Sequence, residues 1–341
     1  APWSPRSSGA SRDGGGDTGL LTGASAGAAG GGGGGGGRRP PPPADIKTWL
    51  QYHLDYMGVD RIFLSVEDTP QLKEVLEAAP PSWKSKVTAW YQAPAPQGED
   101  QRPTDDYETL QARQVKAMAM AKKQCEAEGI DWLLHIDDDE LLYTPQHRAV
   151  GSVLAAMPAE FNQAYIPNVE AVYPSADTKS CFREAAEFNV NRYKFAAYAN
   201  GKAAVRVADT EAHPAGPHQW RDANNEEPPS IHLDAEPFGP PLMVVHFESC
   251  PFTRWEDKFY ELGNTDQEKV SHIPFPFYRS SIARMQQCRA EGPVSFVQES
   301  EVRRSGEHAY KSQEPDCSES SLKQFWAQWK TEENPRLRKN D

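Results

Sequence analysis

Apolar runs that stop at acidic residues are the clearest pattern in this chain. Residues 132–136 are apolar apart from one histidine, and four consecutive acids follow, Asp137 to Glu140. Apolar character resumes at once in residues 141–143. A short run with these bounds predicts a buried strand that carries polar groups to its exposed end. Because open α/β sheets bind ligands outside the carboxyl ends of their strands, we expect a functional site here.

Predicted helices and strands alternate in the first half of the chain. Two strands, over residues 61–66 and 86–91, precede the strand that leads into the acidic run. This alternation is typical of α/β folds with parallel strands. His53 lies on the apolar stripe of the first helix, and we interpret it as a packed histidine. Apolar positions at helical spacing predict helices over residues 45–57, 70–79 and 106–128.

Shorter elements are predicted after the acidic run. Asn200-Gly201 is a strong hairpin signal, so residues 195–207 are predicted to form two paired strands. The last predicted helix, over residues 322–329, is amphipathic, and we expect it to dock on the domain. The remaining helices are predicted over residues 150–157 and 253–262, and short strands over residues 164–166, 171–173 and 242–245.

Composition divides the chain into three parts. Residues 1–43 are rich in Gly, Ser, Ala and Pro, and this composition cannot bury a core, so we expect a disordered Gly/Pro-rich segment. Residues 44–290 hold most predicted elements and have the length of a single α/β domain. Residues 291–341 form a polar extension with one amphipathic helix.

Charge and cysteine content narrow the class of protein. The net charge is −13 and no basic stripe occurs, which argues against nucleic acid as a partner. Five cysteines are scattered along the chain, and an odd number cannot all pair with one another. A luminal protein with one or two disulfides and a reduced cytosolic protein are both compatible with them. Neither a signal peptide nor a long apolar span occurs, and we expect the chain to be a fragment of a longer gene product.

The four adjacent acids indicate a cation. Their carboxylates repel one another at the end of a buried strand unless a positive charge offsets them. Alternate side chains of an extended chain share a face, so Asp137 and Asp139 are predicted to point together while Asp138 points away. Two hard oxygen ligands that leave positions open suit Mg²⁺ or Mn²⁺ carrying a phosphorylated substrate. The alternative is an acidic turn that only solvates the strand end, which leaves the following apolar residues unexplained.

Other candidate residues lie at or near predicted strands. Glu67 or Asp68 follows the first predicted strand and would hold a ribose hydroxyl, although a helix cap explains Asp68 nearly as well. Lys202 and Arg206 share one face of a predicted strand and would neutralise a diphosphate, or else they are solvated charges on a hairpin. His246 ends another apolar run, so a strand would deliver this polar side chain at its end. The alternative is a structural histidine that hydrogen-bonds to backbone carbonyls.

The acidic run also resembles a known motif. Asp137-x-Asp139-Glu140-Leu141 resembles the Asp-x-Asp motif of GT-A glycosyltransferases, specifically the Asp-x-Asp-Glu-Phe form of glycosyltransferase family 92 and its family-2-like relatives. Leu141 stands where those relatives usually have Phe. Further segments that agree in order lie over residues 49–64, 200–206, 216–218 and 245–247.

The resemblance implies a GT-A-like, Rossmann-like mixed sheet flanked by helices, formed by residues 44–290. It implies an enzyme, a glycosyltransferase of the hexosyltransferase class, that moves a sugar with inversion from a nucleotide-diphosphate sugar to a glycan or other hydroxyl acceptor. A UDP-sugar is the favoured donor. Related enzymes are commonly type II membrane proteins of the Golgi, so the Golgi lumen or membrane is the expected location, through an anchor outside this chain.

The same resemblance implies a metal site. Asp137 and Asp139 would bind Mn²⁺ or Mg²⁺, which acts as a Lewis acid on the diphosphate. A histidine from the C-terminal half would complete the site, and His246 and His218 are the matching candidates. Asp137 would also contact the donor.

Catalytic roles follow for the remaining polar residues. Glu140 is the motif acid that is not assigned to metal, and it is the predicted general base that deprotonates the acceptor. Glu184 and Glu187 are alternatives for this role. Arg206, together with the metal, would stabilise the negative charge of the leaving diphosphate, and Lys202 would contact the same group.

Two other functions stay open. GT-A enzymes begin with a strand that helps to hold the nucleotide base, and polyglycine and polyproline stand where it is expected here, so we predict that this strand is missing. A non-catalytic GT-A-like binding protein or a truncated gene product is therefore one alternative. A haloacid-dehalogenase-like phosphatase is another, with Asp137 as nucleophile, although its motif normally lies near the start of the domain and is followed by Gly-Thr or Val.

Overall fold

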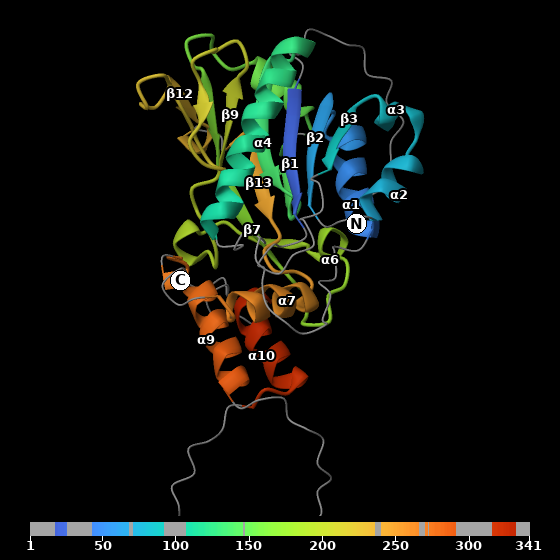
Figure 1. Ribbon diagram of the computed structural model, residues 1–341, viewed down its shortest axis with the longest axis vertical. Coiled ribbons are helices and arrows are strands. Elements are labelled where there is room, and N and C mark those ends of the chain that lie inside the picture. The colour runs from blue at the N-terminus through green and yellow to red at the C-terminus, as the bar shows by residue number, and fades with distance from the viewer. Residues whose placement is uncertain are drawn as a thin grey trace, which may run out of the picture.

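A seven-stranded mixed sheet lies at the centre of the molecule (Figure 1). The computed structural model describes residues 18–25, 43–67, 71–91, 107–145, 147–235, 240–265, 270–271, 273–290 and 316–331. From edge to edge the strands are β12 (Ser230–His232), β6 (Gln163–Ile166), β9 (Lys202–Arg206), β4 (Trp132–Asp137), β1 (Thr18–Ser25), β2 (Arg61–Glu67) and β3 (Val87–Tyr91). The strands from β4 to β3 are parallel, and β9 is antiparallel to β4 and β6.

A smaller sheet of four strands continues the chain beyond the acidic run. Its strands are, in order, β5 (Glu140–Tyr143), β13 (Met243–His246), β7 (Asn168–Val172) and β8 (Glu187–Asn189). Because β4 ends at Asp137 and β5 begins at Glu140, the chain passes from the large sheet to the small one at the four acids. Two short strands, β10 (His213–Pro214) and β11 (Trp220–Arg221), pair separately.

Helices flank the large sheet and form a further layer below both sheets in the view of Figure 1. They are α1 (Pro43–Gln51), α2 (Gln71–Glu77), α3 (Pro81–Lys84), α4 (Tyr107–Glu128), α5 (Val150–Ala155), α6 (Cys181–Glu184), α7 (Phe252–Leu262), α9 (Pro276–Ala290) and α10 (Glu319–Lys330). The first helix begins at Pro43, and Asp45 lies in its first turn. Among the helices that the structure describes, none has both the length and the hydropathy that a bilayer crossing requires.

Alternate residues of β4 face two separate cores. Leu134 packs in a core that includes Trp49 of α1, whereas Leu133 packs in a core that includes Met118 of α4. Each of these side chains is at most 2% exposed. Helices therefore cover both faces of the sheet, as the burial of parallel strands requires. The predicted α/β class, a mixed sheet flanked by helices, is confirmed.

Strand β1 corrects the expectation that the first strand is missing. It lies in the middle of the large sheet and pairs in parallel with both β2 and β4. Residues 18–25 therefore contribute an element to the fold, although we assigned them to a disordered segment. The sequence of β1, Thr-Gly-Leu-Leu-Thr-Gly-Ala-Ser, is short and rich in glycine, so its local signal is weak. Its neighbours supply hydrogen bonds on both edges.

The predicted hairpin at Asn200-Gly201 does not form. Strand β9 begins only at Lys202, and it pairs with β4 and β6 instead of the preceding segment. Gly201 has a positive φ of 64°, and a Cβ there would collide with the carbonyl oxygen of Ile166. Glycine is therefore required by close backbone approach at the start of β9 and not by a hairpin turn.

The C-terminal helix docks on the domain as predicted. In α10 the ring of Trp326 is fully buried, stacks on Tyr173 at 5.6 Å and donates its indole N–H to the Ser249 carbonyl at 2.9 Å. Two disulfides fix this part of the fold, Cys181–Cys250 and Cys288–Cys317. Cys125 is a free buried thiol.

His53 is a packed histidine, as predicted. Its side chain is completely buried, its Nδ1 lies 3.0 Å from the Trp49 carbonyl oxygen, and its Nε2 accepts a hydrogen bond of 3.2 Å from the Leu142 amide. The imidazole is therefore neutral, with a proton on Nδ1. Burial lowers the pKa of His53 to about 3. This ring joins α1 to β5, the strand that begins at the acidic turn.

We expect His53→Gln to flatten the acid limb of the stability profile. In the wild type, the unfolded chain binds a proton at His53 below about pH 6.5, but the folded chain does not, so stability falls with decreasing pH by up to about 1.4 kcal/mol per pH unit. The variant lacks this uptake. Urea unfolding between pH 7 and pH 4.5 measures the slope, and exposed His213→Gln is the control. Equal slopes in wild type and His53→Gln would contradict the assignment.

Candidate active site

The acidic run forms a closed turn between the two sheets. The Asp137 amide donates a hydrogen bond of 2.7 Å to Glu140 Oε2, so the last residue of β4 and the first residue of β5 hold each other. The Tyr198 hydroxyl donates to Glu140 Oε1. Glu140 is completely buried. Its carboxylate therefore fixes the turn that presents Asp138 and Asp139.

Lys202 contacts two of the four acids. Its ammonium lies 2.7 Å from Asp137 Oδ2 and 3.3 Å from Glu140 Oε2, and its side chain is fully buried. Burial raises the pKa of Asp137, but the charge of Lys202 outweighs it and holds that pKa well below its usual range. Burial dominates at Glu140 and raises its pKa well above the usual range. Gln114 adds a hydrogen bond of 3.0 Å to Asp137 Oδ1.

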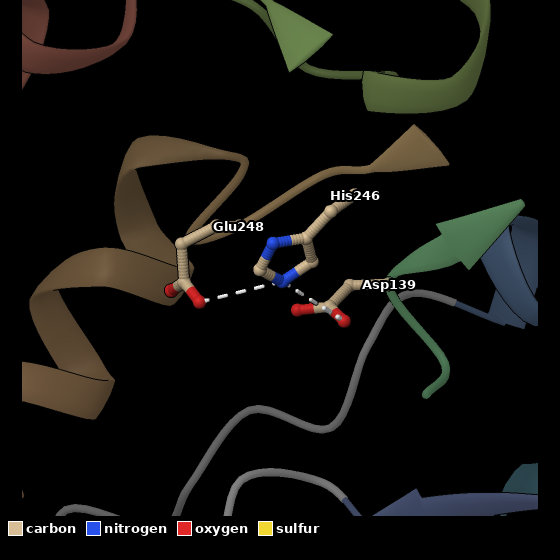
Figure 2. A group of neighbouring side chains, drawn as sticks. All are labelled: Asp139, His246 and Glu248. Atoms are coloured by element: carbon tan, nitrogen blue, oxygen red, sulfur yellow. Dashed lines mark ion pairs between the residues drawn. The ribbon is translucent and has the colours of Figure 1, made fainter. Parts of the chain in front are cut away.

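A third acid belongs to a different group. Figure 2 shows the carboxylates of Asp139 and Glu248 facing Nε2 of His246. This nitrogen lies 3.8 Å from Asp139 Oδ1 and 3.6 Å from Glu248 Oε2. Their ligand atoms all lie within 4.8 Å of one another. Donors that share one small divalent ion at about 2.1 Å stand roughly 3 to 4 Å apart, so the two His246 distances fit such an ion.

Sheet register explains why these residues meet. His246 ends β13, and it pairs with Glu140 of β5 on one side and with Glu170 of β7 on the other. The backbone N–H of Phe247 donates to the Asp139 carbonyl at 2.8 Å, which ties the end of β13 to the acidic turn. Glu248 follows two residues after His246. Its Oε1 accepts from Lys258 at 2.9 Å.

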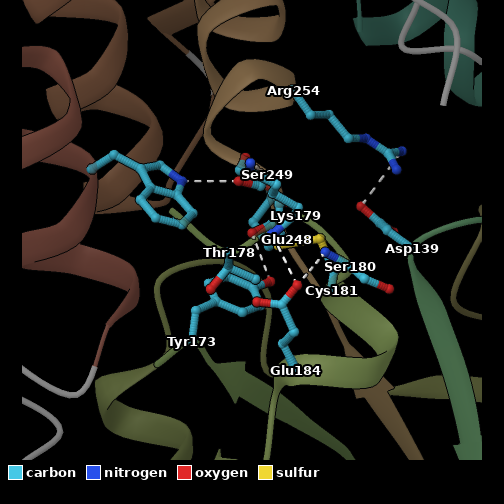
Figure 3. Close-up of a disulfide and its surroundings, with 12 residues drawn as sticks. Asp139, Tyr173, Thr178, Lys179, Ser180, Cys181, Glu184, Glu248, Ser249 and Arg254 are labelled. Carbon is cyan, nitrogen blue, oxygen red and sulfur yellow. Dashed lines mark hydrogen bonds and ion pairs between the residues drawn. A yellow bond between two sulfur atoms is a disulfide. The ribbon is translucent and has the colours of Figure 1, made fainter. Parts of the chain in front are cut away.

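Arg254 of α7 lies on the other side of Asp139. Its Nη2 is 2.8 Å from Asp138 Oδ1 and 3.9 Å from Asp139 Oδ2. Burial raises the pKa of Asp138 to about 6, although Arg254 opposes this shift. Figure 3 shows Arg254, Asp139 and Glu248 around the Cys181–Cys250 disulfide. A small pocket here is lined by Asp45, Ile46, Asp138, Asp139, Cys181, Phe182, Phe247, Cys250 and Arg254.

The predicted metal ligands separate into two places. Asp139 and His246 lie together, and Glu248, which sequence reasoning missed, joins them. Asp137 is held by Lys202 instead. His218 is not a member of the group: its Nδ1 lies 2.6 Å from the Gly201 carbonyl oxygen, and burial lowers its pKa to about 3. The one signal for Glu248 was its spacing from His246, because alternate residues of an extended chain share a face.

Arg206 lies at the wrong end of its strand for the predicted role. It pairs with Trp132 at the start of β4, whereas Asp137 ends that strand. Its guanidinium donates to the carbonyl of Phe161 at 2.7 Å and to that of Met157 at 2.9 Å. The prediction that Arg206 and Lys202 share a face of the strand used only the alternation of side chains. Alternation does not determine how far apart two residues lie along the strand. The expectation that Arg206 stabilises a leaving group at this site is therefore wrong.

The remaining candidates differ in what the structure describes. Asp68 and the side chain of Glu67 lie outside the described residues, so the ribose role stays a prediction. Among the proposed bases, Glu184 accepts from the backbone of Ser180 at 2.8 Å and thus caps its own helix. Glu187 is exposed on the edge strand β8. Glu140 is enclosed by the donors that fix the acidic turn, and its role as general base stays a prediction.

The chain is similar in sequence to two known proteins. No family model matches the chain. Two Arabidopsis thaliana proteins, each described as glycosyltransferase-like, are 28% identical over 212 residues and 27% identical over 209 residues. Each alignment covers 51% of this chain, and it covers 46% of the first relative and 40% of the second. The chain thus matches less than half the length of either relative. Membership in family 92 stays a prediction.

Two solved structures are similar to this chain at low sequence identity. HddC from Yersinia pseudotuberculosis, complexed with GMP-PN, is 15% identical over 71% of this chain and 98% of its own, with a TM-score of 0.33. A CMP:2-keto-3-deoxy-manno-octonic acid synthetase complexed with CTP is 14% identical over 56% of this chain and 75% of its own, with a TM-score of 0.28. At these scores the likeness does not bear on function.

Proposed function

We propose that the protein is a metal-dependent glycosyltransferase that moves a sugar from a nucleotide-diphosphate sugar to a hydroxyl acceptor with inversion. The observation that carries this proposal is the group formed by Asp139, His246 and Glu248 beside the acidic turn at the carboxyl end of β4. Ligands of open α/β sheets bind at such strand ends. The similarity to two proteins described as glycosyltransferase-like supports the proposed reaction class.

The donor atoms of this group suit Mn²⁺ better than Mg²⁺. Asp139, His246 and Glu248 offer two carboxylates and one imidazole nitrogen, and Mg²⁺ prefers oxygen ligands alone. Asp139 and Glu248 would supply negative charge, and His246 would supply Nε2, the nitrogen that faces both carboxylates. An ion held there would act as a Lewis acid on the diphosphate of the donor.

The turn residues have a positioning role in this proposal. Glu140 and Lys202 are both completely buried, and they hold Asp137 at the end of β4. Asp137 is 28% exposed at its side chain, and Lys202 and Gln114 each contact one of its two oxygens. We propose that the exposed part of this carboxylate orients the sugar or ribose of the donor. A charged group with fixed neighbours loses little entropy on binding.

The two disulfides bear on location. Disulfides persist in oxidising compartments and are rare in cytosolic proteins. Cys181–Cys250 and Cys288–Cys317 lie within the described fold, where each joins segments that are distant in sequence. We therefore propose a luminal location in the secretory pathway, and the Golgi is the compartment that fits the proposed reaction.

A donor panel tests the proposed function. We expect the chain to release nucleotide slowly from one of several UDP- and GDP-sugars when Mn²⁺ is present, because water substitutes for the acceptor. Mg²⁺ should support a lower rate, and EDTA should abolish release, since the ligand set includes an imidazole. Released UDP or GDP is measured by chromatography. A folded chain that binds and hydrolyses no donor with either metal would favour the non-catalytic alternative.

A further inference from the structure

The proposed reaction needs a cation at the leaving group, and the two cations predicted for it are engaged elsewhere. When the bond from the anomeric carbon to the diphosphate oxygen breaks, its electron pair stays on that oxygen, and the negative charge must be stabilised. Arg206 lies at the far end of β9. Lys202 is enclosed between Asp137 and Glu140, and its side chain is 0% exposed.

Arg254 is the cation at the open side of the acidic turn. Its side chain is 26% exposed, whereas Lys202 is fully enclosed. It lines the pocket that also contains Asp138 and Asp139. Asp139 connects it to the metal group, since Oδ1 faces His246 while Oδ2 faces Arg254. An anion that contacts a metal at Asp139 is therefore within reach of this guanidinium.

The chemistry of arginine fits a diphosphate. A guanidinium presents five N–H donors in a planar fork that matches phosphate oxygens, and it stays charged at all accessible pH values. Within the described residues, the ion pairs of Arg254 with Asp138 and Asp139 both use Nη2. Arg254 also lies in the first turn of α7, where the helix dipole favours an anion.

We propose that Arg254 is a catalytic residue that binds the diphosphate of the donor and stabilises the leaving nucleoside diphosphate. This inference rests on the proposed function. The acceptor oxygen forms a bond to the anomeric carbon and loses its proton to a base, while the bond to the diphosphate oxygen breaks. The products are a glycoside, a nucleoside diphosphate and a proton. Arg254 exchanges its contact with Asp138 for the phosphate oxygens when the donor binds, before the bond to the sugar breaks.

The test separates phosphate binding from a structural role. Calorimetry in Mn²⁺ compares UDP with UMP, and GDP with GMP, on wild type and on Arg254→Gln. We expect the wild type to prefer one diphosphate over its monophosphate. The variant should bind that diphosphate about 10- to 100-fold more weakly and the monophosphate nearly as before, because a charge-assisted hydrogen bond to the second phosphate is lost.

Mn²⁺ binding without nucleotide is the second readout. Electron paramagnetic resonance of free Mn²⁺ should show that Arg254→Gln binds the ion as well as the wild type or better, because a positive charge 3.9 Å from Asp139 is gone. A structural role predicts the opposite, a joint loss of Mn²⁺ and nucleotide affinity. That result, or an unchanged preference for the diphosphate, would overturn the inference.

Two further variants complete the design. Arg254→Lys keeps the charge beside Asp138 and loses the fork, so it should fold and show an intermediate diphosphate preference. Arg192→Gln is the matched control, because Arg192 is 57% exposed and its ion pair with Asp234 at 3.6 Å lies outside the pocket. It should behave as wild type. If the wild type itself binds neither UDP nor GDP in Mn²⁺, the proposed function fails, and the inference falls with it.

Discussion

Asp139→Asn should lower Mn²⁺ affinity by at least about 100-fold and reduce nucleotide release from the donor to the uncatalysed level. Asp139 is the one acid of the turn whose carboxylate faces His246, at 3.8 Å. An amide of the same size keeps one oxygen but removes the negative charge that attracts the ion. Calorimetric titration with Mn²⁺ and chromatography of released nucleotide measure the two effects.

Neighbouring acids provide matched controls for this variant. Asp138→Asn makes the same change one residue earlier, and it should leave Mn²⁺ affinity close to that of the wild type, because Asp138 contacts Arg254 and is not in the metal group. Thermal unfolding in EDTA shows whether each variant is folded. Equal losses of Mn²⁺ affinity in Asp138→Asn and Asp139→Asn would contradict the assignment.

A second pair of variants distinguishes the metal site predicted from the motif from the one that the structure indicates. The Asp-x-Asp motif predicts Asp137 as a ligand, whereas the structure places Glu248 beside His246 at 3.6 Å and Asp137 beside Lys202. Glu248→Gln should therefore reduce Mn²⁺ affinity more than Asp137→Asn does. The reverse order would support the motif-based assignment and would move the metal toward Asp137.

Sequence analysis predicts best the helices and strands in which apolar and polar residues alternate with a clear period. The strand that became β4 was visible because an apolar run ends in charged residues, and burial of Leu133 and Leu134 on opposite faces follows from its period of two. Strand β1 has no such run, since glycines interrupt it. Its place in the sheet comes from pairing with β2 and β4, and a local sequence window does not contain those partners.

The candidate site shows the same division. Asp139 and His246 were predicted because each stands at the end of an apolar run. Glu248 and Arg254 lie beyond the strand, and their approach to Asp139 depends on where α7 packs, which is a tertiary property. The predicted role of Arg206 was wrong for a related reason. Parity places a side chain on a face of a strand, but register with the neighbouring strand decides at which end it lies.

Lys202→Met should destabilise the fold by about 3 to 5 kcal/mol, the usual effect of removing one partner from a buried ion pair. The ammonium is fully enclosed and lies 2.7 Å from Asp137 and 3.3 Å from Glu140. Without it, two carboxylates of a closed turn face each other with no positive charge. Urea unfolding at pH 7 measures the loss, and Lys47→Met on the exposed face of α1 is the control.

The pH dependence identifies the origin of this loss. Without Lys202, the pKa values of Asp137 and Glu140 in the folded state must rise, because burial then acts unopposed. The folded variant therefore binds protons that the unfolded chain does not bind above pH 5, and its deficit relative to wild type should shrink as the pH falls from 7 to 5. A combined variant that also carries Asp137→Asn and Glu140→Gln removes the unpaired charges and should recover most of the stability at pH 7. A deficit that is independent of pH and persists in the combined variant would mean that Lys202 contributes through packing alone, and that the acids of this turn are not held by its charge.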